Sequence, residues 1–264
     1  MRWRKATSVL LGCVVPVLAT GCGGDDSPGI PEPGPPVGNA VLPDLVPSPQ
    51  RNVATQKTRR GWRMRFNTII VNAGKGDFLL RGTREPGSTW SIEQDVPYSS
   101  SGAQRVPLRS AAVWGGDGHE HWHIVRVASV WLVPLGEDGK PVHDSKRLVD
   151  TKVGFCFYDH THELGRGPEE AVYSAHTCGH EDDTEFGMGL SPGWNDTYLQ
   201  SLPGQSIDIT DLADGQYRLF TEIDEQADFR EATRSNNLTW IDLDVQTTPQ
   251  GRIAIRTATG PQPS

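Results

Sequence analysis

Three histidines alternate with other residues in the sequence GHEHWH at 118–123. Side chains on a β-strand point to its two faces in turn, so the imidazoles of His119, His121 and His123 would share one face. Glu120 would then lie on the opposite face. Three imidazoles on one face are costly to protonate together, and a divalent transition metal bound at about 2.0 Å relieves that cost. The ligand type alone leaves copper, zinc, iron and nickel open.

The histidine segment must curl to place both of its ends on one ion. In a straight strand the Cα atoms of residues four apart, such as His119 and His123, are separated by roughly 13 Å. A glycine-rich stretch at 115–118 offers the backbone freedom to begin such a curl. His176 or His180 could supply a fourth ligand. The alternative is a solvent-facing polar strand that carries histidines without any metal.

Short strands must position these histidines, because apolar and polar residues alternate along most of the chain. With 29 glycines and 20 prolines among 264 residues, turns are frequent and long helices are disfavoured. We therefore predict an all-β fold, an antiparallel β-sandwich or barrel-like domain with long loops and little helix. The expected strands cover residues 62–72, 77–81, 121–135, 153–158, 206–209, 215–224 and 238–245. We expect 77–81 to return beside 62–72, and 161–195 to form a long loop.

The N-terminus has the order of a bacterial lipoprotein signal peptide. Three cations within residues 2–5 precede a short apolar stretch at 9–19, and small residues then lead to Cys22. We expect residues 1–21 to be the signal peptide and Cys22 to be lipidated, so that the protein is anchored in the cell envelope. An ordinary cleaved secretory signal is the alternative. Either reading places the mature protein outside the cytoplasm.

The rest of the chain divides by composition. Residues 22–41 are rich in Pro and Gly and predict a disordered linker, 42–258 predict the folded domain, and 259–264 a flexible tail. The folded part contains two cysteines, Cys156 and Cys178. In an oxidising compartment, two such cysteines most simply form one disulfide.

The charge balance limits the classes of partner. The chain has 25 Lys and Arg against 33 Asp and Glu, a formal net charge of −8. This argues against nucleic acid and leaves cationic partners open. No internal apolar run reaches the roughly 18 residues that a membrane span needs, so we expect membrane contact only through the N-terminal lipid anchor.

Six segments, in the same order along the chain, resemble the catalytic domain of the lysyl oxidase family. They are LPDLVPSP at 42–49, MRFNTIIVNAGKGDFLL at 64–80, HEHWH at 119–123, DTKVGFCFYD at 150–159, GLSPGWNDTY at 189–198 and IDITDLADGQYRL at 207–219. The sequence SNN at 235–237 follows before the last expected strand. The first two segments are weak individually, but all six in order are highly specific.

The resemblance implies a copper-dependent amine oxidase that makes its own quinone cofactor. In this family the three histidines of the HxHxH motif bind Cu(II), and a lysine and a tyrosine crosslink to form lysine tyrosylquinone. The corresponding crosslinking positions are Lys152 and Tyr198. Asp196 is either a catalytic base, a group that supports the site from behind, or a plain turn residue. The implied partners are dioxygen and a primary amine, either peptidyl lysine on surface proteins or a small amine, which is released as an aldehyde with hydrogen peroxide and ammonia.

Two other classes of function remain open at this point. A noncatalytic envelope lipoprotein could use the same β-sandwich as a metal-binding interaction module, with Tyr198 unmodified. A zinc hydrolase would need a general base beside the metal, and Glu120 is expected on the opposite face of the strand from the histidines.

Overall fold

The computed structural model describes residues 39–99, 102–116, 119–149, 154–249 and 253–258. All of these belong to one compact unit, residues 32–264, and the other unit, residues 1–31, lies outside the described residues. The side chain of His119 is also outside the described part.

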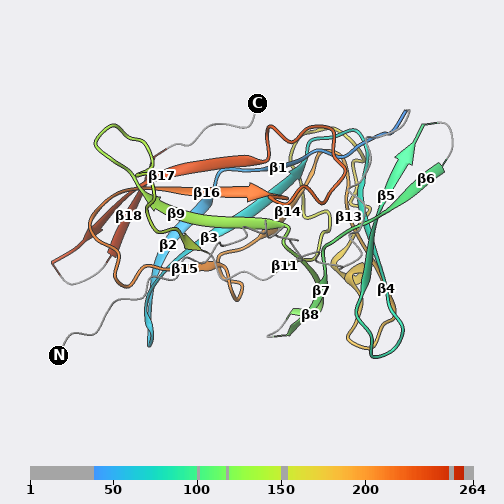
Figure 1. Cartoon of the computed structure of the whole chain (residues 1–264), viewed down its shortest axis with the longest axis horizontal. Coiled ribbons are helices and arrows are strands. Elements are labelled where there is room, and N and C mark those ends of the chain that lie inside the picture. The colour runs from blue at the N-terminus through green and yellow to red at the C-terminus, as the bar shows by residue number, and fades with distance from the viewer. Residues whose placement is uncertain (1–38, 100–101, 117–118, 150–153, 250–252, 259–264) are drawn as a thin grey trace, which may run out of the picture. The chain divides into compact units, whose positions relative to one another are not determined.

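The described residues form four antiparallel sheets and one short 3-10 helix, η1 (Ala175–Cys178) (Figure 1). The six-stranded sheet contains β1 (Leu45–Pro47), β2 (Arg51–Thr58), β3 (Gly61–Asn72), β12 (Thr161–His162), β14 (Trp194–Tyr198) and β15 (Ser206–Asp208). The five-stranded sheet contains β9 (Ala128–Pro134), β10 (Leu148–Val149), β16 (Gly215–Ile223), β17 (Leu238–Thr247) and β18 (Ile253–Ala258). The four-stranded sheet contains β4 (Phe78–Thr83), β5 (Ser91–Tyr98), β6 (Gly102–Pro107) and β13 (Glu185–Leu190), and the three-stranded sheet contains β7 (Ala112–Gly116), β8 (His119–Val125) and β11 (Gly154–Phe155).

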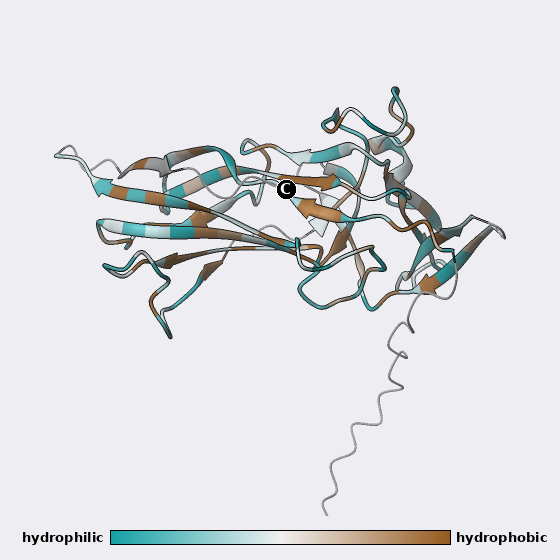
Figure 2. Ribbon diagram, turned by 90° about the horizontal axis from the view of Figure 1, so that it is seen from above, coloured by the Kyte–Doolittle hydropathy of each residue, from teal (hydrophilic) through white to brown (hydrophobic). Residues whose placement is uncertain are grey.

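One hydrophobic core lies between the five-stranded sheet and the first half of β3. Along β16 the inward side chains of Tyr217 and Leu219 are buried and alternate with half-buried neighbours. They pack in one cluster with Met64 and Phe66 of β3. Figure 2 shows the resulting alternation of hydrophobic and hydrophilic bands along the strands. This two-layer packing confirms the predicted antiparallel sandwich.

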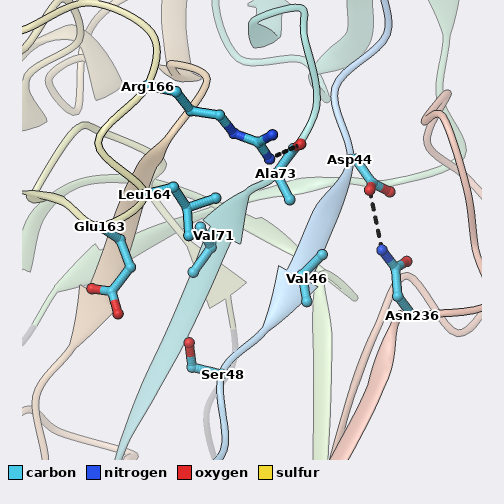
Figure 3. Close-up of a pocket in the computed structure, with 9 residues that line it drawn as sticks. All are labelled: Asp44, Val46, Ser48, Val71, Ala73, Glu163, Leu164, Arg166 and Asn236. Atoms are coloured by element: carbon cyan, nitrogen blue, oxygen red, sulfur yellow. Dashed lines mark hydrogen bonds between the residues drawn. The ribbon is translucent and has the colours of Figure 1, made fainter. Parts of the chain in front are cut away.

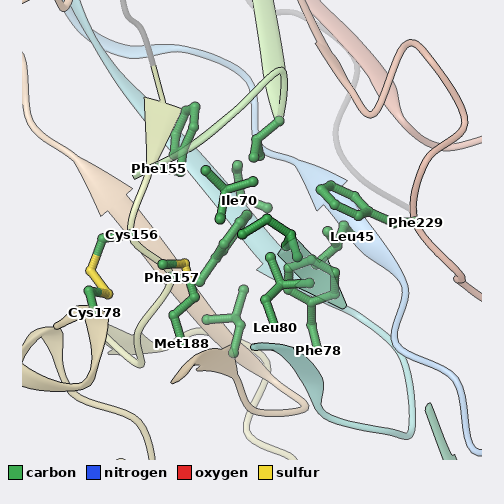
Figure 4. Close-up of a cluster of buried hydrophobic side chains, with 14 of the residues drawn as sticks. Leu45, Ile70, Phe78, Leu80, Phe155, Cys156, Phe157, Cys178, Met188 and Phe229 are labelled. Carbon is green, nitrogen blue, oxygen red and sulfur yellow. A yellow bond between two sulfur atoms is a disulfide. The ribbon is translucent and has the colours of Figure 1, made fainter. Parts of the chain in front are cut away.

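A second core carries the disulfide. Cys156 and Cys178 are bonded, as the cysteine count predicted, and both are fully buried. Phe78 packs edge-to-face on Phe157 with ring centroids 4.9 Å apart (Figure 4). The second half of β3 contributes Ile70 to this core, so one long strand connects the two.

Three expectations about individual strands were wrong. Residues 77–81 do not return beside β3, because β4 pairs with β5 and β13 instead. The stretch 121–135 is two strands of different sheets, broken near Arg126, whose φ is +63°. The expected loop at 161–195 contains the strands β12 and β13 and the first two residues of β14.

Among the described residues, the structure contains no helix with the length and apolarity to span a membrane.

Candidate functional site

Strand β8 carries the histidines between two neighbours. It pairs with β7 through His123 and Val113, and with β11 through Ile124 and Phe155. The β7–β8 register is irregular between Trp114 and Gly116. This irregularity lies beside the glycine-rich stretch where the sequence predicted a curl.

His121 and His123 converge on one point. Their Nε2 atoms are 3.0 Å apart, and their rings meet edge-to-face with centroids 4.7 Å apart. Two nitrogen ligands about 2.0 Å from one ion, at angles of about 90–109°, would be about 2.8–3.3 Å apart. The pair therefore fits two ligand positions on a single transition metal. Without a metal, the same distance is an N–H···N hydrogen bond between neutral rings.

The remaining candidate ligands do not complete a cluster in the part of the chain that the structure describes. No group of three or more His, Cys, Asp or Glu side chains there is arranged to hold a metal. The imidazole of His119 is not among the described side chains. His176 and His180 are both exposed. The carbonyl oxygen of His180 accepts a hydrogen bond from Trp122 Nε1 at 2.7 Å, which places its main chain at the face of β8 opposite His121.

An aromatic cluster supports β8 from that opposite face. The Trp122 ring is buried and packs against Trp114 and Trp90, with centroids 5.3 and 5.0 Å away. The Arg84 guanidinium lies 4.5 Å from the centroids of both Trp90 and Trp122. Glu120 is exposed. These contacts fix the strand and thereby the direction in which its histidines point.

Tyr198 lies beside the histidine strand and is held by its hydroxyl group. The phenol oxygen accepts a hydrogen bond from the Cys156 N–H at 2.6 Å and donates one to the Cys156 carbonyl at 3.2 Å. The ring packs edge-to-face on Phe155 at 4.6 Å and meets the His123 ring at 6.3 Å. The side chain is only 3% exposed. The predicted crosslinking tyrosine is therefore next to one of the predicted metal ligands.

The surroundings of Tyr198 keep its phenol protonated. Burial raises its pKa well above the ordinary value of 10.0, and the charge of Asp196 raises it further. The Cys156 N–H lowers the pKa but does not outweigh burial. Asp196 also raises the pKa of Tyr158, after the larger effect of burial. One carboxylate thus acts on two phenols.

Asp196 lies within strand β14 and is fully buried, so the turn role considered for it was wrong. Strand β14 pairs with β3 and places Asp196 opposite Ile70. Residues 196 and 198 are two apart and therefore share a face of the strand. The carboxylate and the Tyr198 phenol are consequently on the same side of β14.

Two features of the site were missed by sequence reasoning. One is the main chain of Cys156, which binds the Tyr198 hydroxyl. The other is Gly154, where a Cβ atom would lie 2.6 Å from the Ile124 carbonyl oxygen and 3.0 Å from His123 Cβ. Only glycine lets β11 approach the histidine strand this closely. The glycine in VGFC, inside an expected strand, was the available signal.

Lys152, the other predicted crosslinking residue, lies outside the described residues, as does Cys22. The described chain resumes at Gly154, two residues after Lys152.

A cavity of about 460 Å³ lies away from the histidines, between β1, β3 and the loop after β12 (Figure 3). Its wall includes Asp44, Glu163 and Asn236. Asn236 donates a hydrogen bond to Asp44 at 3.1 Å, and Arg166 donates one to the Ala73 carbonyl. The cavity shares no lining residue with the His121, His123 and Tyr198 cluster, so we treat it as separate from the candidate site.

Comparison with known proteins identifies a family for the chain. The family model described as Lysyl oxidase matches residues 98–251, which include the histidine strand, the disulfide and Tyr198. The chain is 28% identical over 207 residues to lysyl oxidase homolog 1 of Homo sapiens, covering 75% of this chain and 32% of that protein. It is 25% identical over 210 residues to protein-lysine 6-oxidase of Gallus gallus, covering 76% and 45%. The chain thus spans less than half the length of these relatives.

Proposed function

Since the chain belongs to the lysyl oxidase family, whose model covers more than half of it, we propose that it is a copper-dependent oxidase of primary amines. The observation that carries this proposal is the position of Tyr198, whose ring meets the ring of His123 while His123 Nε2 lies 3.0 Å from His121 Nε2. A phenol and a converging pair of imidazoles in one buried place are the residue types that this chemistry needs.

In this proposal the copper is held by His119, His121 and His123. The 3.0 Å separation of the His121 and His123 nitrogens supports two of these positions. The third position is proposed from the sequence alone, because His119 precedes His121 by two residues and its side chain is outside the described part of the chain. His176 or His180 remains the proposed source of a fourth ligand, and the hydrogen bond from Trp122 to the His180 carbonyl makes His180 the weaker candidate.

The proposed organic cofactor forms from Lys152 and Tyr198. Bound copper and a lysine tyrosylquinone would supply the electrophilic carbonyl and the redox couple that convert a primary amine, water and dioxygen into an aldehyde, ammonia and hydrogen peroxide. Lys152 precedes Gly154 by two residues in the sequence. Phe155, the next residue, contacts the Tyr198 ring.

Tyr198 is proposed to be prepared for this role by its hydrogen bonds. With both a donor and an acceptor from Cys156 on its hydroxyl, the ring cannot rotate away without losing two buried hydrogen bonds. The disulfide to Cys178 in turn restrains the Cys156 main chain. The segment that carries Lys152 is therefore the same one that holds the phenol.

Asp196 is proposed as the base that removes a proton from the substrate carbon next to the nitrogen. It is a buried carboxylate on the same face of β14 as Tyr198, and its charge acts on that phenol. A carboxylate also attracts the cationic form of an amine substrate into a site of low polarity. Glu120 is exposed and has no role in the proposed mechanism.

We further propose that the enzyme works outside the cytoplasm, anchored through a lipid on Cys22. Without the three cations of residues 1–21, the mature chain has 22 Lys and Arg against 33 Asp and Glu, and this acidic balance favours cationic substrates such as lysine side chains of surface proteins or small amines. Dioxygen is the second substrate.

The test compares the full chain with His121→Ala after copper loading in air. The wild type is expected to bind copper, to develop quinone absorbance and to release hydrogen peroxide from a primary amine such as cadaverine. His121→Ala should lose all three, because it removes one nitrogen of the converging pair. The control is His143→Ala, since the His143 side chain is 95% exposed and lies outside the site. Quinone absorbance retained in His121→Ala would contradict the proposal.

A further inference from the structure

One short hairpin concentrates positive charge in an otherwise acidic chain. Residues 57–65 contain five Lys and Arg and no Asp or Glu. The remaining sequence therefore has 20 cations against 33 acidic residues. These residues form the end of β2, the turn and the start of β3 (Figure 1).

Three of the five cations are exposed and have no ion pair among the described residues. Arg59 and Arg60 form the two-residue turn, and Lys57 lies opposite Trp62 in the strand before it. The Lys57 ammonium is 5.1 Å from the Trp62 ring centroid. We call Lys57, Arg59 and Arg60 the basic turn. Their charges face solvent without a carboxylate partner in the described part of the chain.

The other two cations of the hairpin are already engaged. Arg63 pairs with Asp208 at 3.3 Å. Arg65 donates to the carbonyl oxygens of Gln200 and Leu202. Arg63 and Arg65 therefore already contact other groups of the fold. The cations of this hairpin that remain available to an external partner are those of the basic turn.

The basic turn is held in a fixed conformation. Gly61 has φ +124°, and a Cβ there would lie 2.0 Å from Thr210 Oγ1. The Trp62 N–H donates to the same Thr210 oxygen at 3.0 Å. Thr58 Oγ1 donates to the Gly61 carbonyl at 2.9 Å, which closes the turn. Three cations are thus presented together from one rigid loop, with little further ordering needed on binding.

We propose that the basic turn binds the anionic headgroups of a lipid membrane. Each Lys or Arg near an anionic membrane surface is attracted to it, while the acidic remainder of the chain is repelled. The two effects together would orient the molecule with the β2–β3 turn toward the surface. Trp62, half-buried under Lys57, places an aromatic ring where such rings favour the membrane interface.

A membrane is favoured over other polyanions because of where the chain is proposed to be anchored. The inference rests in this respect on the lipid at Cys22, which would hold the domain near a bilayer by a short linker. It does not depend on copper or on the quinone. The sequence predicted that the lipid anchor alone would contact the membrane. The basic turn would be a second contact.

The experiment measures flotation of the full chain with vesicles of phosphatidylcholine alone and of phosphatidylcholine with about one third phosphatidylglycerol. The test variant combines Lys57→Gln, Arg59→Gln and Arg60→Gln. The matched control combines Lys75→Gln, Lys140→Gln and Lys146→Gln, which removes three exposed cations elsewhere. The wild type and the control should prefer anionic vesicles about tenfold or more at low salt, and the test variant should lose that preference. Matching thermal unfolding of all three proteins excludes loss of the fold.

Three outcomes would overturn the inference. The test variant could keep the wild-type preference, or the control could lose it equally, which would make net charge the cause. Binding to double-stranded DNA or to a sulfated polysaccharide could also be stronger than binding to anionic vesicles that supply the same concentration of negative charge. That result would identify a different partner. Peroxide release from a soluble amine is read separately and should be unchanged in the test variant, so failure of the oxidase proposal and failure of this one are distinguishable.

Discussion

At the scale of residues, the site depends on a few side chains whose roles follow from their surroundings. His121 and His123 supply nitrogens 3.0 Å apart, and Tyr198 is buried beside them with its hydroxyl fixed by Cys156. Asp196 is the buried carboxylate that faces the same side of β14 as Tyr198. The pair of imidazoles is therefore provided by β8, and the phenol and the proposed base by β14.

Asp196→Asn tests the proposed base. Asparagine keeps the shape of the side chain but cannot accept a proton, so kcat with a primary amine should fall by about 10²–10⁴-fold. Copper content and the crosslink should stay at the wild-type level, because Asp196 is not assigned to either. Asp144→Asn, at an 89% exposed side chain, serves as the control and should be active. Full activity in Asp196→Asn would remove this residue from the mechanism.

At the scale of elements, the site exists because β11 lies close to β8. Gly154 permits that approach, and Cys156 then reaches Tyr198 on β14. The three segments come from distant parts of the chain and are brought together by these contacts and by the meeting of the His123 and Tyr198 rings.

Gly154→Ala should therefore push β11 away from the histidine strand. The new Cβ would meet the Ile124 carbonyl oxygen at 2.6 Å, and the expected loss of stability is about 1–3 kcal/mol, with loss of quinone formation. Urea denaturation measures the first effect and absorbance the second. Gly187→Ala is the matched control, since a Cβ there would have the Leu80 carbonyl oxygen, 4.0 Å away, as its nearest atom outside the adjacent residues. Equal behaviour of the two variants would show that the close approach is unimportant.

The sequence predicted the positions of strands better than it predicted which strands pair with each other. Alternation in 62–66, with 67–72 taken as its continuation, identified β3, because the side-chain period reveals which face is buried. It could not show that β3 pairs with β2 and β15 at one end and with β1 and β14 at the other. Strand β13 was missed because its glycines conceal the pattern, and at Gly189 a Cβ would meet the Tyr173 ring at 2.8 Å.

The candidate site was predictable to a similar extent. The shared face of His121 and His123 follows from their spacing alone. The hydrogen bonds between Tyr198 and Cys156 could not be predicted, because every residue except proline carries a main-chain donor and any of them could have filled this role.

At the scale of the whole folded unit, a buried acidic network ties the first strand to the loop between β16 and β17. Glu231 accepts hydrogen bonds from the Leu45 N–H at 3.0 Å and from Asn237 Nδ2 at 2.7 Å. Burial raises the Glu231 pKa from 4.5 to about 7, and the Arg234 guanidinium 3.7 Å away does not offset it. As the pH rises, the folded unit thus keeps the Glu231 proton to a higher pH than the unfolded chain does.

This proton makes stability depend on pH. Between about pH 4.5 and 7 the folded state binds more protons than the unfolded state, so stability should fall as the pH rises through this window, by about 3 kcal/mol in total. Urea denaturation at several pH values, with a chelator to exclude cations from the carboxylate, measures the slope. Glu231→Gln should flatten it, whereas Glu225→Gln, at an exposed position, should not. An identical slope in wild type and Glu231→Gln would contradict the assignment.

Peptide mass spectrometry of the copper-loaded, oxygen-exposed chain tests the central claim most directly. The account predicts that peptides containing Lys152 and Tyr198 are recovered as one crosslinked species, and that the species is absent from Tyr198→Phe. Recovery of the two peptides separately from a fully copper-loaded sample would contradict the oxidase proposal and favour a noncatalytic metal-binding module.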